Sequence, residues 1–306
     1  MAYTDTYSQP DAPDPVLSEE LVLELARAHA PWVSRVTAVD ETGGEARAYM
    51  CDQDLVVKTQ RPPRLRPRTS LAKEAYILDR IAQQISLPVP RVLGYGHSEN
   101  VEYLVMTRIP GLALERASIS GPARVAVLEA LGTTLRRIHQ MDQTGMASSN
   151  LVPGDSNAED LRQRITAGFE DAIAGLGTDP RWSDGVDLAA AATQCLAGLP
   201  AETSPVTLHS NPGPEHCFVD AGGATFTGLI DFGDAYRSHP ALDVRSWFSL
   251  DDSRHMLAGY RSLGPLPQDF DLVWRAGLLL TEFRLAARGY REPRALMRTI
   301  SQLLPS

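Results

Sequence analysis

The stretch Leu208–Asp234 constrains the fold more than any other part of the 306-residue chain. It reads as a polar loop, a short strand, a Gly-Gly turn, a second strand and an acidic end. Residues 226–230 alternate and then end apolar, which predicts a half-buried strand of a hairpin, with the glycines supplying the positive φ of its turn. Asp231 follows that strand directly, and a carboxylate in such a place suits Mg²⁺. His209 and His216 bound the polar loop, so the hairpin should bring two polar clusters together.

These residues resemble the signature of the aminoglycoside phosphotransferase-like kinases, small-molecule relatives of the protein kinases. That signature is His-x-Asp, then Asn or sometimes His five residues on, a hairpin, and Ile-Asp-Phe/Trp-Gly/Ser-Asp. Here it stands as His209-Ser210-Asn211, His216 and residues 230–234. The departure is Asn211, which occupies the family's catalytic aspartate position.

Composition narrows the class of protein. A formal net charge of −9 argues against nucleic acid as the main partner. The three cysteines are scattered and form no CxxC pair, which predicts a reducing, cytoplasmic setting. The N-terminus has no basic region followed by an apolar core, so we expect no signal peptide. No apolar run approaches the ~18 residues of a spanning helix, so we expect no membrane segment.

The order of strand and helix patterns predicts two lobes. Residues 1–17 are polar and proline-rich and are expected to be a flexible tail. Residues 18–108 contain short strands and one long helix, capped at its start by Thr69 or Ser70, which predicts a small lobe built on an antiparallel sheet. The resemblance implies that this lobe binds the nucleotide. Residues 109–306 are mainly helical and contain the catalytic loop and substrate site. The expected class is therefore α+β, and the resemblance implies a two-lobed protein-kinase-like fold.

The elements expected within these lobes follow from periodicity and turn residues. In the small lobe we expect a helix from about residue 18, strands near 32–38, 45–50, 54–59, 91–96 and 101–109, and a helix from about 70 to 85. A hinge is expected near 107–111. In the large lobe we expect helices from about 121 and near 159–175, 185–199, 241–248, 253–262, 268–289 and 292–304.

Lys58 ends an apolar strand, and Glu74 lies early in the next helix. A lysine there is costly unless it is paired, which predicts an ion-pair partner. The resemblance implies that Lys58 contacts the α- and β-phosphates of ATP and that Glu74 anchors Lys58. The alternative is an exposed edge-strand lysine and a surface glutamate.

The acidic end of the hairpin is the expected metal site. The resemblance implies that Asp231 binds Mg²⁺ between the β- and γ-phosphates; the alternative is a turn aspartate that caps the next segment. Asp234 either helps this site or only caps the residues after it. His216 stands where the wider kinase family has a metal-binding asparagine, and it either reaches the metal or a phosphate or hydrogen-bonds within its loop.

Asn211 and His209 form the expected catalytic loop. An ionised aspartate at position 211 would accept the proton of the substrate hydroxyl, which asparagine cannot do at neutral pH. Positioning and metal charge dominate phosphoryl transfer, so Asn211 predicts slow turnover instead of none. The exchange fits either a natural variant or an inactivating substitution. His209 is expected to fix the loop through its ring nitrogens, and Asp243 matches a family carboxylate that buttresses the loop.

The nucleotide base should meet backbone groups of the hinge. The resemblance places the adenine-reading amide and carbonyl near Met106 and Arg108, and the choice between ATP and GTP is left open. Gly43 and Gly44 precede the Lys58 strand without a GxGxxG pattern. They either cover the phosphates or form an ordinary hairpin turn.

Two charged stretches complete the pattern. Residues 58–73 contain six basic residues and no acid, and form either a solvated loop or a contact to phosphate. Residues 142–187 are acidic, and form either a solvated helix face or, as the resemblance implies, a surface that neutralises a cationic antibiotic. The acids in question are Asp155, Glu159, Asp160, Glu170, Asp171, Asp179 and Asp184.

Together these features predict an ATP- and Mg²⁺-dependent O-phosphotransferase that acts on a hydroxyl of a small molecule. Resistance or self-protection against a natural-product antibiotic is the favoured context, from the resemblance alone. The main alternative is a pseudokinase, a nucleotide- or ligand-binding protein silenced by Asn211. A second alternative is a non-kinase binding or scaffold protein. The acceptor, the hydroxyl that is modified and the oligomeric state are left open.

Overall fold

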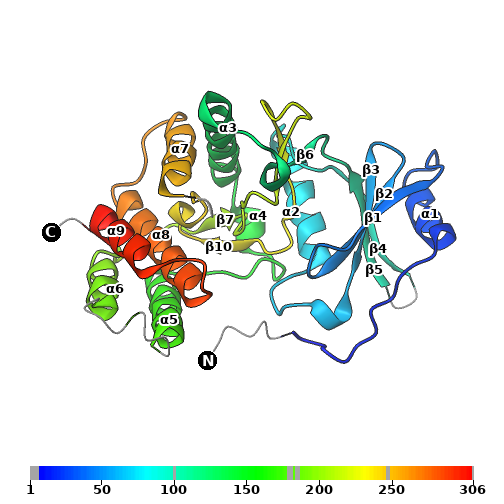
Figure 1. Ribbon diagram of the computed structural model, residues 1–306. Coiled ribbons are helices and arrows are strands. Elements are labelled where there is room, and N and C mark those ends of the chain that lie inside the picture. The colour runs from blue at the N-terminus through cyan, green and yellow to red at the C-terminus, as the bar shows by residue number, and fades with distance from the viewer. Residues whose placement is uncertain (1–6, 99–100, 178–181, 183–186, 246–248, 305–306) are drawn as a thin grey trace.

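Two lobes lie side by side in the computed structural model (Figure 1). The structure describes residues 7–98, 101–177, 182, 187–245 and 249–304. One lobe is a five-stranded antiparallel sheet with two helices, and the other is mainly helical with two small sheets. The predicted α+β class, with a small sheet lobe and a larger helical lobe, is confirmed. No helix in the described ranges is long and apolar enough to cross a membrane.

The small lobe is organised by its sheet, whose strands lie in the order β1-β2-β3-β5-β4. Alternate side chains of a strand point to opposite faces, so each face can be covered by its own helix. Val57 and Val105 pack with α1, whereas Val56 and Leu104 pack with α2. The elements are α1 (Glu19–Arg27), β1 (Val36–Asp40), β2 (Ala46–Cys51), β3 (Leu55–Gln60), α2 (Leu71–Gln84), β4 (Val92–Ser98) and β5 (Val101–Thr107).

Both helices of this lobe begin where the sequence predicts. The Ser18 side chain accepts from the amide of Leu21, and the Ser70 side chain accepts from that of Lys73. Such caps satisfy amides that lack a partner within the helix. The cap at Ser70 matters for the site, because it fixes the turn of α2 that carries Glu74.

The connection between the lobes passes through Gly111. Its φ is +100°, and a Cβ at this position would lie 1.9 Å from the carbonyl oxygen of Val219. Only glycine meets both conditions without strain. At residues 110–111, where the sequence pattern changes from strands to helices, the backbone thus passes close to Val219 of the catalytic hairpin.

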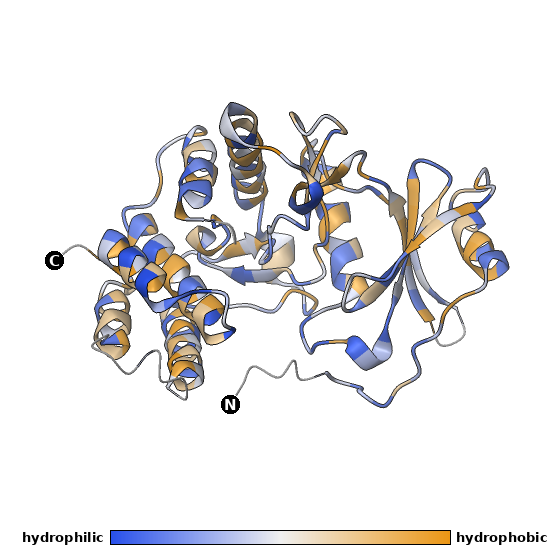
Figure 2. Cartoon of the chain, viewed as in Figure 1, coloured by the Kyte–Doolittle hydropathy of each residue, from blue (hydrophilic) through white to orange (hydrophobic). Residues whose placement is uncertain are grey.

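In the large lobe, α3 packs against α7 and α5 packs against α8. These helices carry both hydrophobic and hydrophilic residues (Figure 2). The elements are β6 (Leu112–Ala113), α3 (Gly121–His139), α4 (Thr144–Ala147), α5 (Ala158–Leu176), α6 (Leu188–Ala197), β7 (Val206–Leu208), β8 (Cys217–Val219), β9 (Phe226–Leu229), β10 (Tyr236–Ser238), α7 (Leu250–Arg261), α8 (Phe270–Ala287) and α9 (Pro293–Leu303).

The helix expected near 241–248 is wrong over the residues that the structure describes. A single 3₁₀ turn, Pro240–Leu242, stands there, and residues 246–248 lie outside the described part. Three tertiary hydrogen bonds hold this segment: the Asp243 carboxylate accepts two amides of the catalytic loop, and the Val244 carbonyl accepts Trp274 Nε1 at 2.6 Å. Tertiary contacts thus override the local helical pattern.

The segment from Tyr7 to Leu17 follows the surface of the small lobe. The Ser8 amide donates to the Leu65 carbonyl at 2.8 Å, and the Leu17 amide donates to the Tyr49 hydroxyl at 2.9 Å. Between them, Asp14 pairs with the largely buried guanidinium of Arg61 at 2.7 Å. The expected flexible tail therefore has defined contacts over its described residues, whereas the domain boundaries themselves stay predictions.

Candidate active site

The hairpin β8–β9 presents its two ends to a cleft lined by residues of both lobes, with a volume of about 1070 Å³. Gly223 supplies the expected positive φ, +71°, in the turn. Asn211 and His216 enter the cleft before β8, and Asp231 enters it after β9. The small lobe contributes Lys58 from β3. The hairpin thus brings the two polar clusters together, as its sequence predicts.

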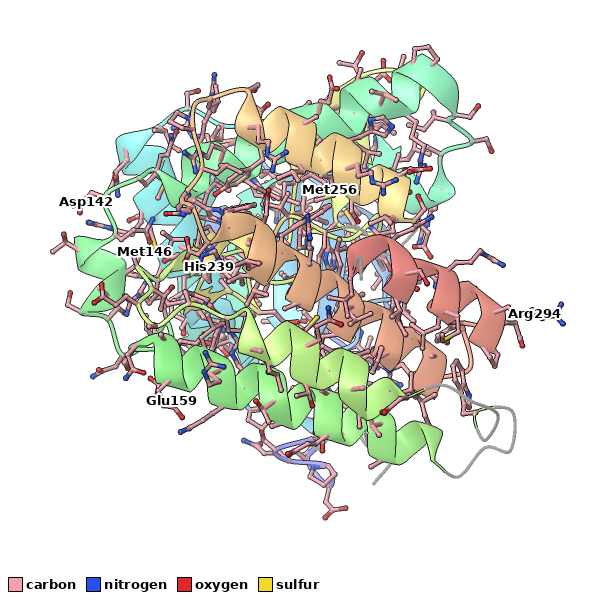
Figure 3. The ribbon with its side chains drawn as sticks, turned by 90° about the vertical axis from the view of Figure 1, so that its left-hand side faces the viewer. Asp142, Met146, Glu159, His239, Met256 and Arg294 are labelled. Carbon is pink, nitrogen blue, oxygen red and sulfur yellow. The ribbon has the colours of Figure 1, made fainter. Side chains whose placement is uncertain are left out.

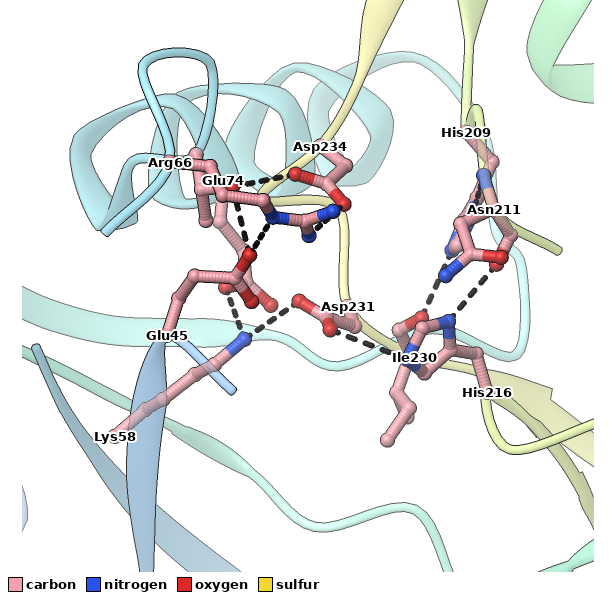
Figure 4. Close-up of polar contacts among 11 residues, drawn as sticks. Glu45, Lys58, Arg66, Glu74, His209, Asn211, His216, Ile230, Asp231 and Asp234 are labelled. Atoms are coloured by element: carbon pink, nitrogen blue, oxygen red, sulfur yellow. Dashed lines mark hydrogen bonds and ion pairs between the residues drawn. The ribbon is translucent and has the colours of Figure 1, made fainter. Parts of the chain in front are cut away.

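Lys58 bridges two carboxylates that come from different elements (Figure 4). Its ammonium lies 2.7 Å from Glu74 Oε2 and 2.7 Å from Asp231 Oδ1. The Glu74 side chain is fully buried, that of Lys58 is 14% exposed, and that of Asp231 is 35% exposed. The expected pairing of Lys58 with Glu74 is present, and Asp231 is the one member of the group that solvent reaches easily.

This arrangement fixes the charges of the three groups. Burial lowers the pKa of Lys58, but Asp231 and Glu74 together raise it above its usual value. Burial raises the pKa of Glu74, and the Lys58 ammonium opposes that effect. Burial also opposes ionisation of Asp231, yet Lys58 and His216 hold the pKa of Asp231 well below its usual range. The Asp231 carboxylate is therefore ionised, lines the cleft and can offer its oxygens as metal ligands.

The backbone is strained where the site is built. Ser210 and Asp231 have φ values of +74° and +70°, a region that non-glycine residues seldom adopt. Asp243 holds the first of these turns, because its carboxylate accepts the His209 amide at 2.6 Å and the Ser210 amide at 2.7 Å. Such strain persists only where neighbouring contacts enforce it. Asp243 is buried and contacts the loop as the sequence predicts for a buttress.

His139 holds Asp243 from behind and was not foreseen from the sequence. Its Nε2 lies 3.1 Å from Asp243 Oδ2, and its Nδ1 lies 2.8 Å from the Tyr260 hydroxyl. Burial would raise the pKa of Asp243, but the hydrogen bond from His139 and the neighbouring charges lower it. No local motif marks His139, since its partner is 104 residues away along the chain.

His209 is a positioning residue in this structure and does not face the cleft as a catalytic group. Its side chain is fully buried, Nε2 donates to the Ile230 carbonyl at 2.8 Å, and Nδ1 accepts the Asn211 amide at 3.3 Å. The ring therefore ties the loop before β8 to the end of β9. Burial lowers the pKa of His209, which keeps it neutral and able to accept at one nitrogen and donate at the other.

His216 links Asn211 to Asp231. Its Nδ1 lies 2.8 Å from the Asn211 carbonyl oxygen, and its Nε2 lies 3.2 Å from Asp231 Oδ2. Both neighbours are acceptors, so both nitrogens carry protons here. Burial alone would lower the pKa of His216, but the Asp231 carboxylate raises it to about 9. An imidazolium cannot bind a metal, so a metal-binding role for His216 requires loss of the Nε2 proton.

The hinge carries the two residues expected to read a purine. Met106 and Arg108 line the same cleft as Lys58. The Arg108 amide, however, donates to the Asp54 carbonyl at 2.7 Å and is engaged within the small lobe. The Thr107 amide is engaged as well, since it donates to the Arg91 carbonyl at 2.9 Å. Ile109, which also lines the cleft, is the better candidate for contact with a base.

The acids between 142 and 187 do not line this cleft, as far as that stretch is described. Asp142 accepts from Thr144, Asp155 is buried against Arg164, and Asp160 accepts the Ser156 amide. Asp142 and Glu159 lie at the outer edge of the large lobe (Figure 3). Two further acids, at 179 and 184, lie outside the described residues. Asp142, Asp155 and Asp160 thus make contacts within the large lobe and none with the cleft.

Asp234 forms an ion pair with Arg66, which the sequence around Asp234 does not predict. It accepts Arg66 Nη2 at 2.7 Å and Thr69 Oγ1 at 2.5 Å. Arg66 comes from the connection between β3 and α2, and its Nε donates to Glu45, directly after the Gly43-Gly44 turn. The basic stretch 58–73 thus supplies both the site lysine and a second cation of the cleft.

Comparison with known proteins bears on this geometry. A model of the phosphotransferase enzyme family matches residues 36–287, from β1 to the end of α8. An aminoglycoside 3'-phosphotransferase of Streptomyces fradiae is 27% identical over 153 residues, which are 48% of this chain and 52% of that protein. The match thus spans about half the length of that relative.

Solved structures share the fold over nearly the whole chain. The GDP complex of aminoglycoside 2'-phosphotransferase-IIIa matches with a TM-score of 0.61 and 18% identity, over 94% of this chain and 97% of that one. The macrolide 2'-phosphotransferase of Brachybacterium faecium has the same score and identity, over 94% and 99%. The family match, which covers both lobes and every residue of the site, decides the assignment: the chain belongs to the phosphotransferase enzyme family.

Proposed function

We propose that the cleft binds a nucleoside triphosphate with Mg²⁺ and transfers its γ-phosphate to a hydroxyl group of a small molecule. The observation that carries this proposal is the meeting of Lys58, Glu74 and Asp231 from three separate elements in one cleft. A fully buried carboxylate that fixes a lysine, beside an ionised and partly exposed carboxylate, is the arrangement that a polyphosphate with a divalent cation requires.

The chain's own residues have distinct tasks in this reaction. Lys58 is fixed by Glu74 and can move from Asp231 to phosphate oxygens without losing its buried partner. Asp231 is ionised and oriented toward the cleft by its positive φ. Ile109 of the hinge lines the cleft and is available for contact with a base. These residues bind and orient the donor, which is most of what phosphoryl transfer asks of a protein.

The donor set fits Mg²⁺ only together with a nucleotide. No group of three or more His, Cys, Asp or Glu side chains within the described residues is arranged to hold a metal ion. Mg²⁺ usually takes one or two carboxylates, phosphate oxygens and water, and Asp231 supplies the first of these. When bound, Mg²⁺ would neutralise charge that develops on the phosphate oxygens. His216 would then either release its Nε2 proton to water, because a nearby cation disfavours the imidazolium, or remain a hydrogen-bond donor within the loop.

Asn211 lines the cleft, and the resemblance implies that it occupies the position of the family's base. Its amide cannot accept the hydroxyl proton, so the acceptor must lose that proton to water or to a phosphate oxygen. The loop itself is intact, since Asp243, His209 and His216 all hold its backbone. We infer slow transfer, reduced by about 10²–10⁴-fold relative to a site with a base.

Asn211 also favours a second candidate function, nucleotide binding without transfer.

The acceptor class for the first candidate includes antibiotics, because the matched family and the Streptomyces fradiae relative are phosphotransferases. The described acids between 142 and 187 do not line the cleft, whereas Glu115 and Glu215 of the large lobe do, so both neutral and cationic acceptors suit the site. ATP and GTP both fit, since solved structures of this fold include complexes with GDP and with ATP.

The test is transfer of labelled γ-phosphate from Mg²⁺ATP and Mg²⁺GTP to a panel of aminoglycosides, macrolides and hydroxylated metabolites. Asp231→Asn serves as the control, because it removes the proposed metal ligand and keeps the shape of the side chain. We expect slow, Mg²⁺-dependent labelling of at least one acceptor that the control abolishes. Nucleotide binding without labelling of any acceptor would instead establish the second candidate, and no Mg²⁺-dependent nucleotide binding would refute both.

A further inference from the structure

The connection between β3 and α2, residues 61–70, forms one wall of the cleft. We call it the β3–α2 loop. Its residue Arg66 lines the same cavity as Lys58 and Asp231. The Arg66 guanidinium lies between the carboxylates of Glu45 and Asp234, and its side chain is 40% exposed (Figure 4).

The β3–α2 loop is anchored at both ends, which holds Arg66 in place. At its start, Arg61 donates to Asp14 at 2.7 and 3.0 Å. At its end, Thr69 donates to Asp234 at 2.5 Å, and Lys73 Nζ, fully buried at the start of α2, donates to the Ala235 carbonyl at 2.9 Å. The loop therefore joins the small lobe to the segment that follows Asp231, and Arg66 is positioned before any ligand arrives.

The two partners of Arg66 mark the path of a polyphosphate. Glu45 directly follows the Gly43-Gly44 turn above the cleft, and Asp234 lies three residues after Asp231. Phosphates that run from the hinge toward Asp231 would pass between these carboxylates and would be repelled by them if Arg66 were absent. A guanidinium held by carboxylates has the donor geometry that phosphate oxygens also need.

We propose that Arg66 is a phosphate-binding residue of the nucleotide site, which exchanges Glu45 for oxygens of the bound polyphosphate and keeps Asp234. Asp234 is the retained partner because Thr69 Oγ1 donates to it at 2.5 Å, whereas Thr69 Oγ1 lies 3.5 Å from Glu45. Glu45 is the released partner because it ends an exposed turn, residues 41–44. The inference rests on the proposed function, since it assigns a residue to the same site.

The exchange predicts opposite effects for the two members of the pair. Arg66→Gln should weaken binding of Mg²⁺ATP by about 10- to 100-fold, the range for loss of a hydrogen bond to a charged group. Glu45→Gln should strengthen it several-fold, because the competing carboxylate is gone. Arg66→Gln/Glu45→Gln should remain weaker than the parent, because it removes the repulsion by Glu45 but does not restore the donor to phosphate. Binding of adenosine, which has no phosphate, should be the same in all of them.

The measurement is calorimetric titration of the full chain with Mg²⁺ATP, adenosine and inorganic tripolyphosphate. Arg68→Gln is the matched control, because it removes the same charge from an exposed position of the same loop that does not line the cleft. We expect less than a threefold change for this control with each ligand. Arg66→Lys should recover part of the affinity, since it restores the charge without the paired donors.

Three results would overturn the inference. Recovery of parental affinity in the double variant would show that Arg66 only neutralises Glu45. Tighter binding of Mg²⁺ATP by Arg66→Gln would show that the arginine closes the cleft against nucleotide. An equal loss for adenosine would show that the substitution damages the lobe as a whole.

Tripolyphosphate separates this inference from the proposed function. If the parent protein binds tripolyphosphate through Arg66 but binds no nucleotide, the proposed function fails and the phosphate site stands. If the parent binds nucleotide with an affinity that Arg66→Gln does not change, the proposed function stands and this inference fails. If the parent binds neither ligand, both fail.

Discussion

Lys58→Met tests how much the buried ion pair of Lys58 and Glu74 contributes to the stability of the protein. The substitution leaves the Glu74 carboxylate, which is fully buried, without the ammonium 2.7 Å away. Removal of one partner of a buried pair costs about 3–5 kcal/mol, because the remaining charge is left uncompensated. Asp231 is 35% exposed and can take up water, so the cost arises at Glu74 and should fall near about 3 kcal/mol.

The loss should depend on pH in a defined direction. In the variant, burial without Lys58 raises the pKa of Glu74 further above its unfolded value. Below the ordinary carboxyl range both folded and unfolded states carry the proton, so the penalty is absent. As pH rises through that range the unfolded state ionises and the folded state resists, so stability is lost until the raised pKa is passed.

Calorimetric melting at pH 5 and pH 8 measures this effect. At pH 8 we expect Tm to fall by about 6–12 °C, as ~3 kcal/mol implies for a chain of this size class, and to fall clearly less at pH 5. Lys58→Met/Glu74→Gln is the control: the neutral amide should recover much of the loss and remove its pH dependence. An equal fall at both pH values, or a fall below about 2 °C at pH 8, would refute the reasoning.

Three further predictions follow from single contacts. The pKa of His216 is raised from 6.5 to about 9, which should add up to about 3 kcal/mol to the free energy of unfolding of the parent. This contribution should be fully present below pH 6.5 and lost as pH rises to 9. Urea unfolding of His216→Asn should lack this loss, and matching pH curves for the two proteins would contradict the assignment. Asp243→Asn exchanges a buried acceptor of two amides for a neutral amide and should cost about 2–3 kcal/mol in the same assay; a change below 0.5 kcal/mol would show that the loop holds its strain without this carboxylate. Gly111→Ala places a Cβ 1.9 Å from the Val219 carbonyl and should destabilise the protein by about 2 kcal/mol or more; an unchanged Tm would show that the passage between the lobes relaxes freely.

The parts of the fold that the sequence predicts are those with local causes. Ser18 and Ser70 cap helices because a side-chain oxygen meets amides two or three residues on, and such signals are visible in the chain itself. The catalytic hairpin was predictable from alternation and its glycine turn. The helix expected near 241–248 fails because Asp243 and Val244 bond to distant groups, and no periodicity reveals such partners.

The candidate site divides in the same way. Lys58, Glu74 and Asp231 were found through motif order and the cost of burying a lysine, and the structure brings them within hydrogen-bonding distance. His139 and Arg66 were missed as individual residues, because their partners lie 104 and 168 residues away. Their signals, a histidine near a helix end and an arginine among prolines, are common in surface segments.

The most direct test of the account compares this protein with its Asn211→Asp variant in phosphate transfer to the same acceptor. Both proteins should bind Mg²⁺ATP with similar affinity, because the proposed contacts to the nucleotide come from Lys58, Asp231 and the hinge and not from position 211. We predict that the variant transfers phosphate about 10²–10⁴-fold faster than the parent, as a restored base would. Equal rates in the two proteins, with nucleotide bound in both, would contradict the claim that Asn211 stands where the base of a phosphotransferase belongs.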